Sequence, residues 1–135
     1  MKSTMLGLTT AILTSVGSAH AQDTLSGNAE AGAVVFKRCM ACHKVGPDAK
    51  NGVGPVLNGV VGRAASAYPD YSYSSANKNS GLIWDEPTLT TYLRAPRKLV
   101  PGTKMAFSGL SKDQEIADVI AYLKQFNAQG QNVGP

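Results

Sequence analysis

The sequence predicts a small all-α protein of one domain. Several segments carry apolar residues at helical spacing, and none shows the strict alternation of a half-buried strand. The chain has 135 residues, an ordinary length for one domain. Hydrophobic residues at 43% and charged residues at 16% indicate a globular chain and exclude a disordered one. The expected fold has three to five short helices joined by long loops.

Residues 1–21 are expected to be a cleaved secretory signal peptide. Lys2 supplies the positive start, residues 6–16 are weakly apolar, and Ala19-His20-Ala21 offers small residues at the cleavage site. The apolar stretch is shorter than the roughly 20 residues that cross a bilayer. An uncleaved anchor or an amphipathic first helix is the alternative. Cleavage after Ala21 would leave residues 22–135 as a periplasmic domain without a transmembrane anchor.

The first helix of this domain is expected to begin at Asn28, a good N-cap residue. Its buried face would consist of Gly32, Val35, Phe36 and Cys39. A second helix is predicted after Asp85, with Pro87 in its first turn and Pro96 at its end. Its buried stripe would consist of Leu89, Tyr92 and Leu93. Residues 44–81, between the two helices, are rich in Gly, Pro, Ser and Asn and are predicted as loops and turns.

The last helix is predicted to begin with a capping box, in which Ser111 is the N-cap and Gln114 lies three positions on. Its buried face would consist of Ile116, Val119, Ile120 and Leu123, with Tyr122 and Phe126 beside it. Before this helix, Pro101 and Gly102 stand in the order of a type II turn. After it, residues 127–135 are polar and Gly-rich and are expected to form a frayed tail.

A few short helices and one long loop would make a poor hydrophobic core by themselves. A large apolar group at the centre would solve this problem, and the run Cys39-Met40-Ala41-Cys42-His43 provides the means to attach one. C-x-x-C-H is the signature of a c-type haem, in which both thiols bond to the haem vinyl groups and the histidine ligates the iron. The sequence therefore predicts one covalently attached haem c, held by Cys39, Cys42 and His43.

Three other interpretations of the cysteine pair are less consistent with the sequence. A thioredoxin-like C-x-x-C would follow a strand and precede a helix, whereas here a helix precedes and a loop follows. A structural zinc site would need a second pair of ligands, but the domain after Ala21 has no other Cys or His. A disulfide between Cys39 and Cys42 would leave His43 without a role.

The second axial ligand of the iron is assigned by elimination. Only Met40 and Met105 lie outside the predicted signal peptide. Met40 stands between the two cysteines and cannot reach the far face of the same haem, whereas Met105 follows the stiff turn at Pro101. The alternative is that Met105 is core filler, as a lone methionine usually is. A His/Met pair fills both axial positions and suits electron transfer.

Further motifs have the order and spacing of a known family. They are residues 39–43, 54–55, 61–63 and 76–79, Tyr73, Trp84, and residues 92–93 and 101–105. On these residues, over about residues 27–126, the chain resembles the class I cytochromes c. More narrowly, it is similar to the bacterial cytochromes c2 and to mitochondrial cytochrome c. The resemblance implies a cytochrome c fold in which helices and loops wrap around one haem.

The resemblance also implies roles around the haem. The Pro55 carbonyl would accept the Nδ1 proton of His43. Tyr92 and Thr103 match hydroxyls on the Met105 side, with Tyr92 donating toward the sulfur. The matches to partners of the buried haem propionates are Arg63, Tyr73 and Trp84. The matches to residues packed on the haem are Leu57, Leu93 and Phe107, of which Leu57 and Leu93 would be core residues in any case. Gly32 and Val119 match a close crossing of the first and last helices.

Four positions depart from the mitochondrial pattern. Val56 stands where Asn is usual, and Asn51 stands where a second His is common. Ser66 and Asp70 replace two loop glycines, which predicts a change in the flexibility of the loop below the haem. None of the four is an expected iron ligand or thioether. The departures therefore concern the fine tuning of the site and not its function.

The resemblance assigns a docking surface to basic residues that ring the exposed haem edge in the family. The matching residues are Arg38, Arg97, Lys98, Lys104 and Lys112. Such a ring would steer the protein onto acidic patches of membrane redox complexes, and a plain solvated surface is the alternative. The expected partners are a bc1-type complex and a cytochrome oxidase or photosynthetic reaction centre. Nucleic acid is not expected, because the net charge of +4 comes without a basic run.

The predicted function is that of a soluble, monomeric, periplasmic one-electron carrier in a respiratory or photosynthetic chain. The alternative is a haem enzyme, such as a peroxidase, or a ligand-binding haem protein. An enzyme needs an open iron position and an acid–base group beside it. His43 is the only histidine after the predicted signal peptide, and Met105 is expected to close the site. We therefore expect no catalytic residue.

Overall fold

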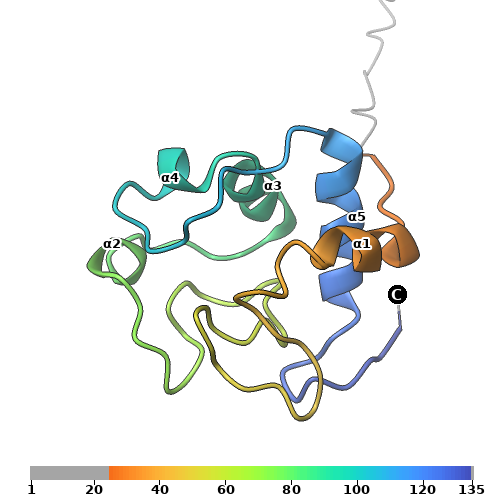
Figure 1. The fold of residues 1–135 in the computed structure, drawn as a ribbon, viewed down its shortest axis with the longest axis horizontal. Coiled ribbons are helices and arrows are strands. Elements are labelled where there is room, and N and C mark those ends of the chain that lie inside the picture. The colour runs from red at the N-terminus through yellow and green to blue at the C-terminus, as the bar shows by residue number, and fades with distance from the viewer. Residues whose placement is uncertain (1–24, 135) are drawn as a thin grey trace, which may run out of the picture.

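The computed structural model describes residues 25–134, so the predicted signal peptide and its cleavage site lie outside the described residues. The helices are α1 (Ala29–Phe36), α2 (Ser75–Lys78), α3 (Glu86–Arg94), α4 (Pro96–Leu99) and α5 (Asp113–Lys124) (Figure 1). β pairing in this range is confined to isolated bridges, Ala64 with Ile83 and Phe126 with Asn132. The prediction of an all-α fold is confirmed. None of the helices in residues 25–134 is long and apolar enough to cross a membrane.

Helix α1 begins at its predicted cap, because the Asn28 side chain accepts a hydrogen bond from the Ala31 N–H at 2.8 Å. The helix lies across α5 (Figure 1). Gly32 makes this crossing possible, since a Cβ atom there would lie 1.9 Å from the Asp118 carbonyl oxygen of α5. Asp118 also accepts from the Asn28 N–H at 2.7 Å, so the start of α1 is bound directly to α5.

Helix α5 has the predicted buried face but not the predicted start. Its N-cap is Lys112, without a side-chain cap, so the capping box of Ser111 and Gln114 is wrong. The Gln114 amide instead donates to the Ser26 carbonyl at 3.0 Å and to the Asp118 carboxylate at 2.8 Å. The Gln114 side chain thus binds the segment that leads into α1 and does not cap α5. The predicted buried residues are buried as expected: Ile116, Val119, Ile120 and Leu123.

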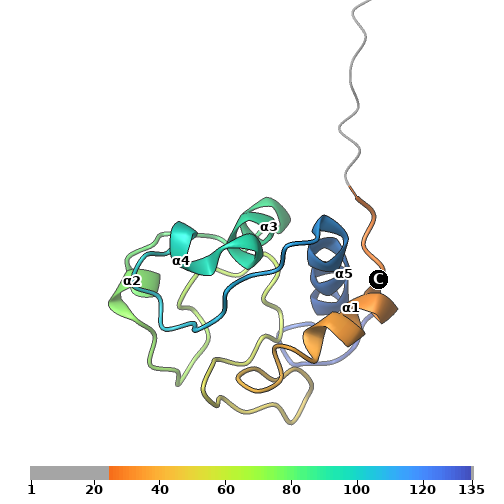
Figure 2. The same cartoon turned by 45° about the horizontal axis from the view of Figure 1, so that its top comes forward.

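Helices α3 and α4 lie above the loop region, with α3 against α5 (Figure 2). Asp85 caps α3 by accepting from the Thr88 N–H at 2.9 Å, as predicted. The predicted stripe of Leu89, Tyr92 and Leu93 is buried. Pro96 follows the end of α3, but it also begins α4, a short helix that the sequence does not predict. Proline can fill both roles because its missing N–H is not needed at the first helical position.

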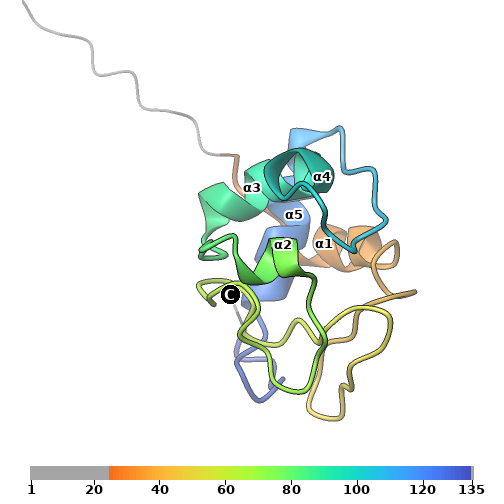
Figure 3. The same cartoon turned by 90° about the vertical axis from the view of Figure 1, so that its left-hand side faces the viewer.

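Residues 37–83 are loops and turns apart from α2, which lies at the side of the molecule opposite α1 (Figures 1 and 3). Asn51 joins two of these loops. Its side-chain amide donates to the Pro69 carbonyl at 3.0 Å, and its oxygen accepts from the Val56 N–H at 2.9 Å. Val56 is fully buried. Two of the four departures from the family pattern therefore belong to one contact that ties the loop after His43 to the loop around Pro69.

The other two departures, Ser66 and Asp70, have a backbone conformation that glycine adopts without strain. Ser66 has φ of 62° and Asp70 has φ of 57°, both in the left-handed region. The Ser66 hydroxyl donates to the Asn77 side-chain oxygen at 2.6 Å, which ties this turn to α2. Side chains at these positions therefore stand where the turns favour glycine.

The end of the chain differs from the expected frayed tail. Residues 127–134 turn back beneath α5 and lie beside the loop that follows α1 (Figures 1 and 2). The Asn127 side-chain oxygen accepts from the N–H groups of Gln129 and Gln131 at 3.0 and 2.9 Å. Polar composition alone does not reveal this turn, because the loop against which it packs, around Gly46, is far away in sequence.

Candidate haem site

A cavity of about 380 Å³ lies at the centre of the loops and helices. Its helical walls consist of Phe36 from α1, Leu89, Tyr92 and Leu93 from α3, and Val119 and Leu123 from α5. The loops contribute Leu57, Val60, Trp84 and Phe107. The residues expected to pack on a haem, Leu57, Leu93 and Phe107, thus line one common cavity. Most of its lining is apolar, as in sites for organic cofactors.

The C-x-x-C-H motif lies at the edge of this cavity, directly after α1. The backbone turns sharply there, since the N–H groups of Cys42 and His43 both bond to the Cys39 carbonyl, at 3.1 and 2.9 Å. This turn brings all three side chains to the cavity wall. Cys39 and Cys42 do not form a disulfide with each other. Burial raises the pKa of the Cys39 thiol, and the Arg38 charge opposes that shift.

His43 is oriented by the loop that follows it. Its Nδ1 donates to the Pro55 carbonyl at 2.7 Å, which leaves Nε2 as the nitrogen with a free lone pair. Gly54 leaves room for the ring, because a Cβ at this position would lie 2.5 Å from the imidazole Cε1. Burial lowers the pKa of His43, and the hydrogen bond to Pro55 opposes this shift. Burial therefore favours the neutral imidazole, the form that binds metals.

Met105 lines the same cavity and is approached through the predicted type II turn. The Thr103 N–H bonds to the Val100 carbonyl at 3.1 Å, and Gly102 has φ of 87°, as such a turn requires. The Thr103 hydroxyl accepts from the Met105 N–H at 3.2 Å. The Tyr92 hydroxyl donates to the Met105 sulfur at 3.3 Å. Burial raises the pKa of Tyr92, so its phenol keeps the proton that this bond uses.

Arg63 brings a partly buried positive charge to the cavity. Its guanidinium donates from Nη1 to the Asn58 carbonyl at 2.7 Å and from Nη2 to the Val56 carbonyl at 3.2 Å. Its Nε is buried and has no partner within the described residues. Tyr73 and Trp84 line the cavity as well. Burial lowers the pKa of Arg63, and the neighbouring Tyr73 and Tyr68 oppose this shift.

These residues fit a haem. The macrocycle of a haem is apolar and carries two carboxylates, and the cavity joins apolar walls to a partly buried guanidinium whose buried Nε–H has no partner among the described residues. A buried carboxylate must be paired or hydrogen-bonded, and Arg63 Nε offers such a bond. Two thiols, an imidazole and a thioether reach the same space. The donor set is therefore complete for covalent attachment and for two axial ligands.

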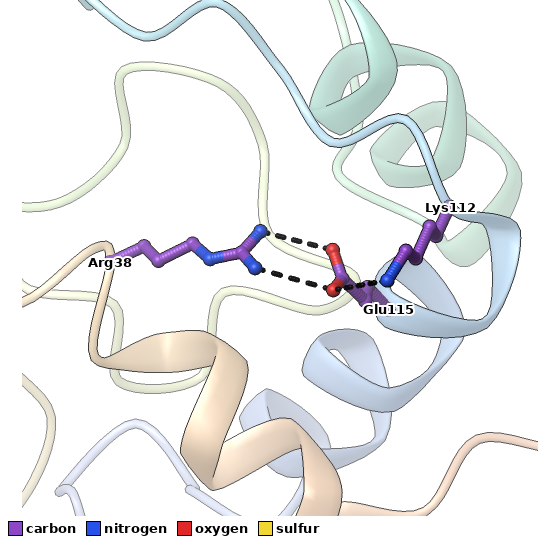
Figure 4. A network of polar contacts seen from close by, with 3 residues as sticks. All are labelled: Arg38, Lys112 and Glu115. Atoms are coloured by element: carbon purple, nitrogen blue, oxygen red, sulfur yellow. Dashed lines mark hydrogen bonds and ion pairs between the residues drawn. The ribbon is translucent and has the colours of Figure 1, made fainter.

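The five basic residues predicted to form a docking ring differ in their surroundings. Arg38 makes two hydrogen bonds to Glu115, at 3.0 and 3.2 Å, and Lys112 lies 3.8 Å from the same carboxylate (Figure 4). The Lys104 ammonium donates to the Ser72 carbonyl at 2.5 Å. Arg97 and Lys98 are exposed on α4 beside Phe107, and no hydrogen bond or ion pair involves their side chains among residues 25–134. Within residues 25–134, Arg97 and Lys98 are thus the two of these five basic residues whose side chains make neither a hydrogen bond nor an ion pair.

Asn58 is a residue that the sequence analysis misses. It is only 5% exposed, and its side chain bonds to both the N–H and the carbonyl of Gly46, each at 2.8 Å. Its own carbonyl holds Arg63. Neither contact has a sequence signature, because both involve backbone groups that any residue would supply.

An all-α domain whose central cavity is bordered by a C-x-x-C-H turn defines a protein with covalently attached haem. Comparison with known proteins agrees. The family profile described as cytochrome c matches residues 29–127. Cytochrome c2 of Blastochloris viridis is 51% identical over 116 residues, which cover 86% of this chain and 87% of that protein. Cytochrome c2 of Rhodomicrobium vannielii is 50% identical over 129 residues, 96% of this chain and 100% of that protein.

A solved structure is also similar. Cytochrome cH from Methylobacterium extorquens superimposes with a TM-score of 0.70 at 49% sequence identity, over 73% of this chain and 99% of that one. The chain therefore belongs to the cytochrome c family and is a class I c-type cytochrome. It carries one covalently attached haem c, and it is an electron-transfer protein.

Proposed function

We propose that this protein is a periplasmic one-electron carrier whose haem iron is ligated by His43 and Met105. The observation that supports this most is that both side chains line one cavity and are each held by a hydrogen bond. Pro55 holds the imidazole at 2.7 Å, and Tyr92 holds the thioether at 3.3 Å. A ligand that is already oriented needs little rearrangement when the iron changes charge, which favours rapid electron transfer.

The haem supplies a one-electron couple between ferric and ferrous iron. The chain would attach it through Cys39 and Cys42 and hold the iron between His43 Nε2 and Met105 Sδ. Arg63 would bind a propionate through its unused Nε–H. The apolar walls would exclude water, and a thioether ligand would favour the ferrous state. With both axial positions filled, the iron would not bind substrates or oxygen, which is why a carrier is favoured over a haem enzyme.

Replacing Met105 with Ala tests the ligation. The oxidised parent protein is expected to be low-spin, with the weak near-infrared band of an iron–thioether bond. Met105→Ala should lose that band, lower the reduction potential, bind carbon monoxide readily and gain peroxidase activity. Tyr92→Phe is the matched control, because it removes only a hydrogen bond of about 1 kcal/mol and should keep the band. A parent protein that bound carbon monoxide as freely as Met105→Ala would contradict the proposal.

We also propose that residues 1–21 direct export and are removed, which would place the carrier in the periplasm. The charge pattern at Lys2 and the small residues before Gln22 support this. Amino-terminal sequencing of the protein isolated from the native host tests it, with Gln22 as the expected first residue. An N-terminus at Met1 on the haem-loaded protein would contradict it.

For docking, we propose that Arg97 and Lys98 lead the association with acidic patches of a bc1-type complex and of a terminal oxidase or reaction centre. Their charges are exposed beside Phe107 at the cavity wall, whereas Glu115 partly neutralises Arg38 and Lys112. Lys98→Glu should slow electron exchange at low salt through the association rate, and 0.5 M salt should remove the difference. Lys50→Glu, an equal change of charge elsewhere, is the control. Equal slowing by both variants would indicate that only net charge matters.

A further inference from the structure

The segment after α5 is closed on itself by hydrogen bonds. The Val133 N–H donates to the Gln125 carbonyl at 2.8 Å, and the Asn127 N–H donates to the Gln131 carbonyl at 3.1 Å. Phe126 and Asn132 form an isolated bridge. Residues 128–134 lie beyond the part of the chain that the family profile matches.

The turn presses its backbone against the loop that follows His43. Gly130 is buried there, and a Cβ at this position would lie 2.1 Å from the Gly46 carbonyl oxygen and 2.5 Å from the Asn58 side-chain nitrogen. The Gly59 N–H donates to the Phe126 carbonyl at 3.1 Å. A Cβ at Gly59 would lie 3.0 Å from the Ala128 backbone. No side chain other than hydrogen fits at Gly130.

Asn58 connects the turn to the cavity, because it contacts both Gly46 and Arg63. Its side chain is held by both backbone groups of Gly46, and Gly130 covers this pair of hydrogen bonds. The Asn58 carbonyl in turn accepts the shorter of the two hydrogen bonds from Arg63, at 2.7 Å. A continuous series of contacts therefore runs from Gly130 through Asn58 to the guanidinium at the cavity. A displacement of the turn would let the Asn58 backbone move and would loosen Arg63.

We propose that residues 127–134 are a positioning element that fixes Arg63 and thereby raises the reduction potential of the haem. The proposal rests on the proposed role of Arg63 as partner of a haem propionate. Reduction adds one negative charge to the haem site, and a fixed guanidinium nearby stabilises that charge, more strongly where water is excluded. A guanidinium that can move lets water in and stabilises the added negative charge less. The end of the chain thus raises the reduction potential of the haem although it lies outside the cavity.

The test is to measure the potential of the haem-loaded protein when the turn is disturbed. Gly130→Ala, and truncation after Asn127, should each lower the equilibrium constant for reduction about three- to tenfold, where tenfold equals about 59 mV for one electron. Gly134→Ala is the matched control, because Gly134 has nearly the same φ, 78° against 76°, but nothing lies within 4 Å of its added Cβ. The control should leave the potential unchanged. An unchanged potential in both disturbed variants would overturn the proposal.

Two further measurements separate this proposal from the function on which it rests. In an Arg63→Lys background, truncation should no longer shift the potential, since contacts that act through one residue are not additive. An equal shift in both backgrounds would overturn the route through Arg63. If Arg63→Lys by itself left the potential unchanged, the propionate role would fail, and the proposal with it. Amide hydrogen exchange at Gly46 should speed up at least tenfold on truncation, and unchanged exchange would show that Asn58 is not held by the turn.

Discussion

In the helix pair of α1 and α5, side chains pack on one another, whereas in residues 37–83 many side chains face a cavity and single hydrogen bonds hold the backbone. Ile116 and Ile120 of α5 are 1% and 3% exposed, and neither lines the cavity. By contrast, the loop around Pro69 is joined to the loop after His43 through the amide of Asn51. The comparison shows that one half of the molecule supplies its own core, while the other half depends on the haem as its core.

The largest expected effect is at the helix crossing. Gly32→Val should lower the free energy of unfolding by about 3 kcal/mol or more, because the new side chain would meet the Asp118 backbone, which cannot rotate away. Denaturant unfolding of the haem-loaded protein measures this change. Val34→Ala on the same helix is the control, since Val34 is 62% exposed and its loss should cost about 0.5 kcal/mol or less. Comparable losses in both variants would show that the crossing is not closely packed.

An intermediate effect is expected where the loop half touches His43, the proposed iron ligand. Gly54→Ala places a Cβ 2.5 Å from the His43 ring, so the ring must shift and its bond to Pro55 must weaken. We expect a loss of about 2 kcal/mol of stability and an altered visible spectrum. Gly52→Ala is the control, because its Cβ would lie 3.6 Å from the nearest atom, an ordinary contact. A parent-like spectrum for Gly54→Ala would mean that the loop yields without moving the ligand.

The smallest effect is expected from backbone strain in the loops. Asp70 has φ of 57°, a conformation that costs most non-glycine residues about 1–2 kcal/mol. Asp70→Gly should therefore raise the free energy of unfolding by up to about 1 kcal/mol, less than the full strain because glycine also gains freedom in the unfolded chain. The free energy of unfolding should rise less in Ser66→Gly, since this variant also loses the hydrogen bond to Asn77. A loss of stability in Asp70→Gly would show that the turn is not strained.

Features that depend on neighbouring residues could be predicted from the sequence. The caps at Asn28 and Asp85 and the turn at Pro101–Gly102 follow from local side-chain and backbone chemistry, and the structure contains all three. The buried stripes of α3 and α5 follow from helical periodicity. The C-x-x-C-H motif identified the haem because its spacing is set by the chemistry of attachment.

Features that depend on backbone groups or on residues far away in sequence could not be predicted. Gln114 has a plausible local partner in Ser111, but Asp118 and the Ser26 carbonyl bind it instead. Arg63 is held by two carbonyl groups, which every residue possesses, so nothing in the sequence marks Asn58 as its partner. The pairing of Arg38 with Glu115 likewise links positions 77 residues apart. A basic residue in a family position is therefore not always a free charge.

The contact between α1 and α5 has a consequence for the order in which the protein is assembled. A chain is made from its N-terminus, and an isolated helix of eight residues is not stable in water. Since α5 is the last helix in the sequence, α1 and the turn at Cys39–Cys42 have no partner until nearly the whole chain is present. Both thiols are then open to solvent, so thioether formation can precede folding and never requires the finished cavity to open.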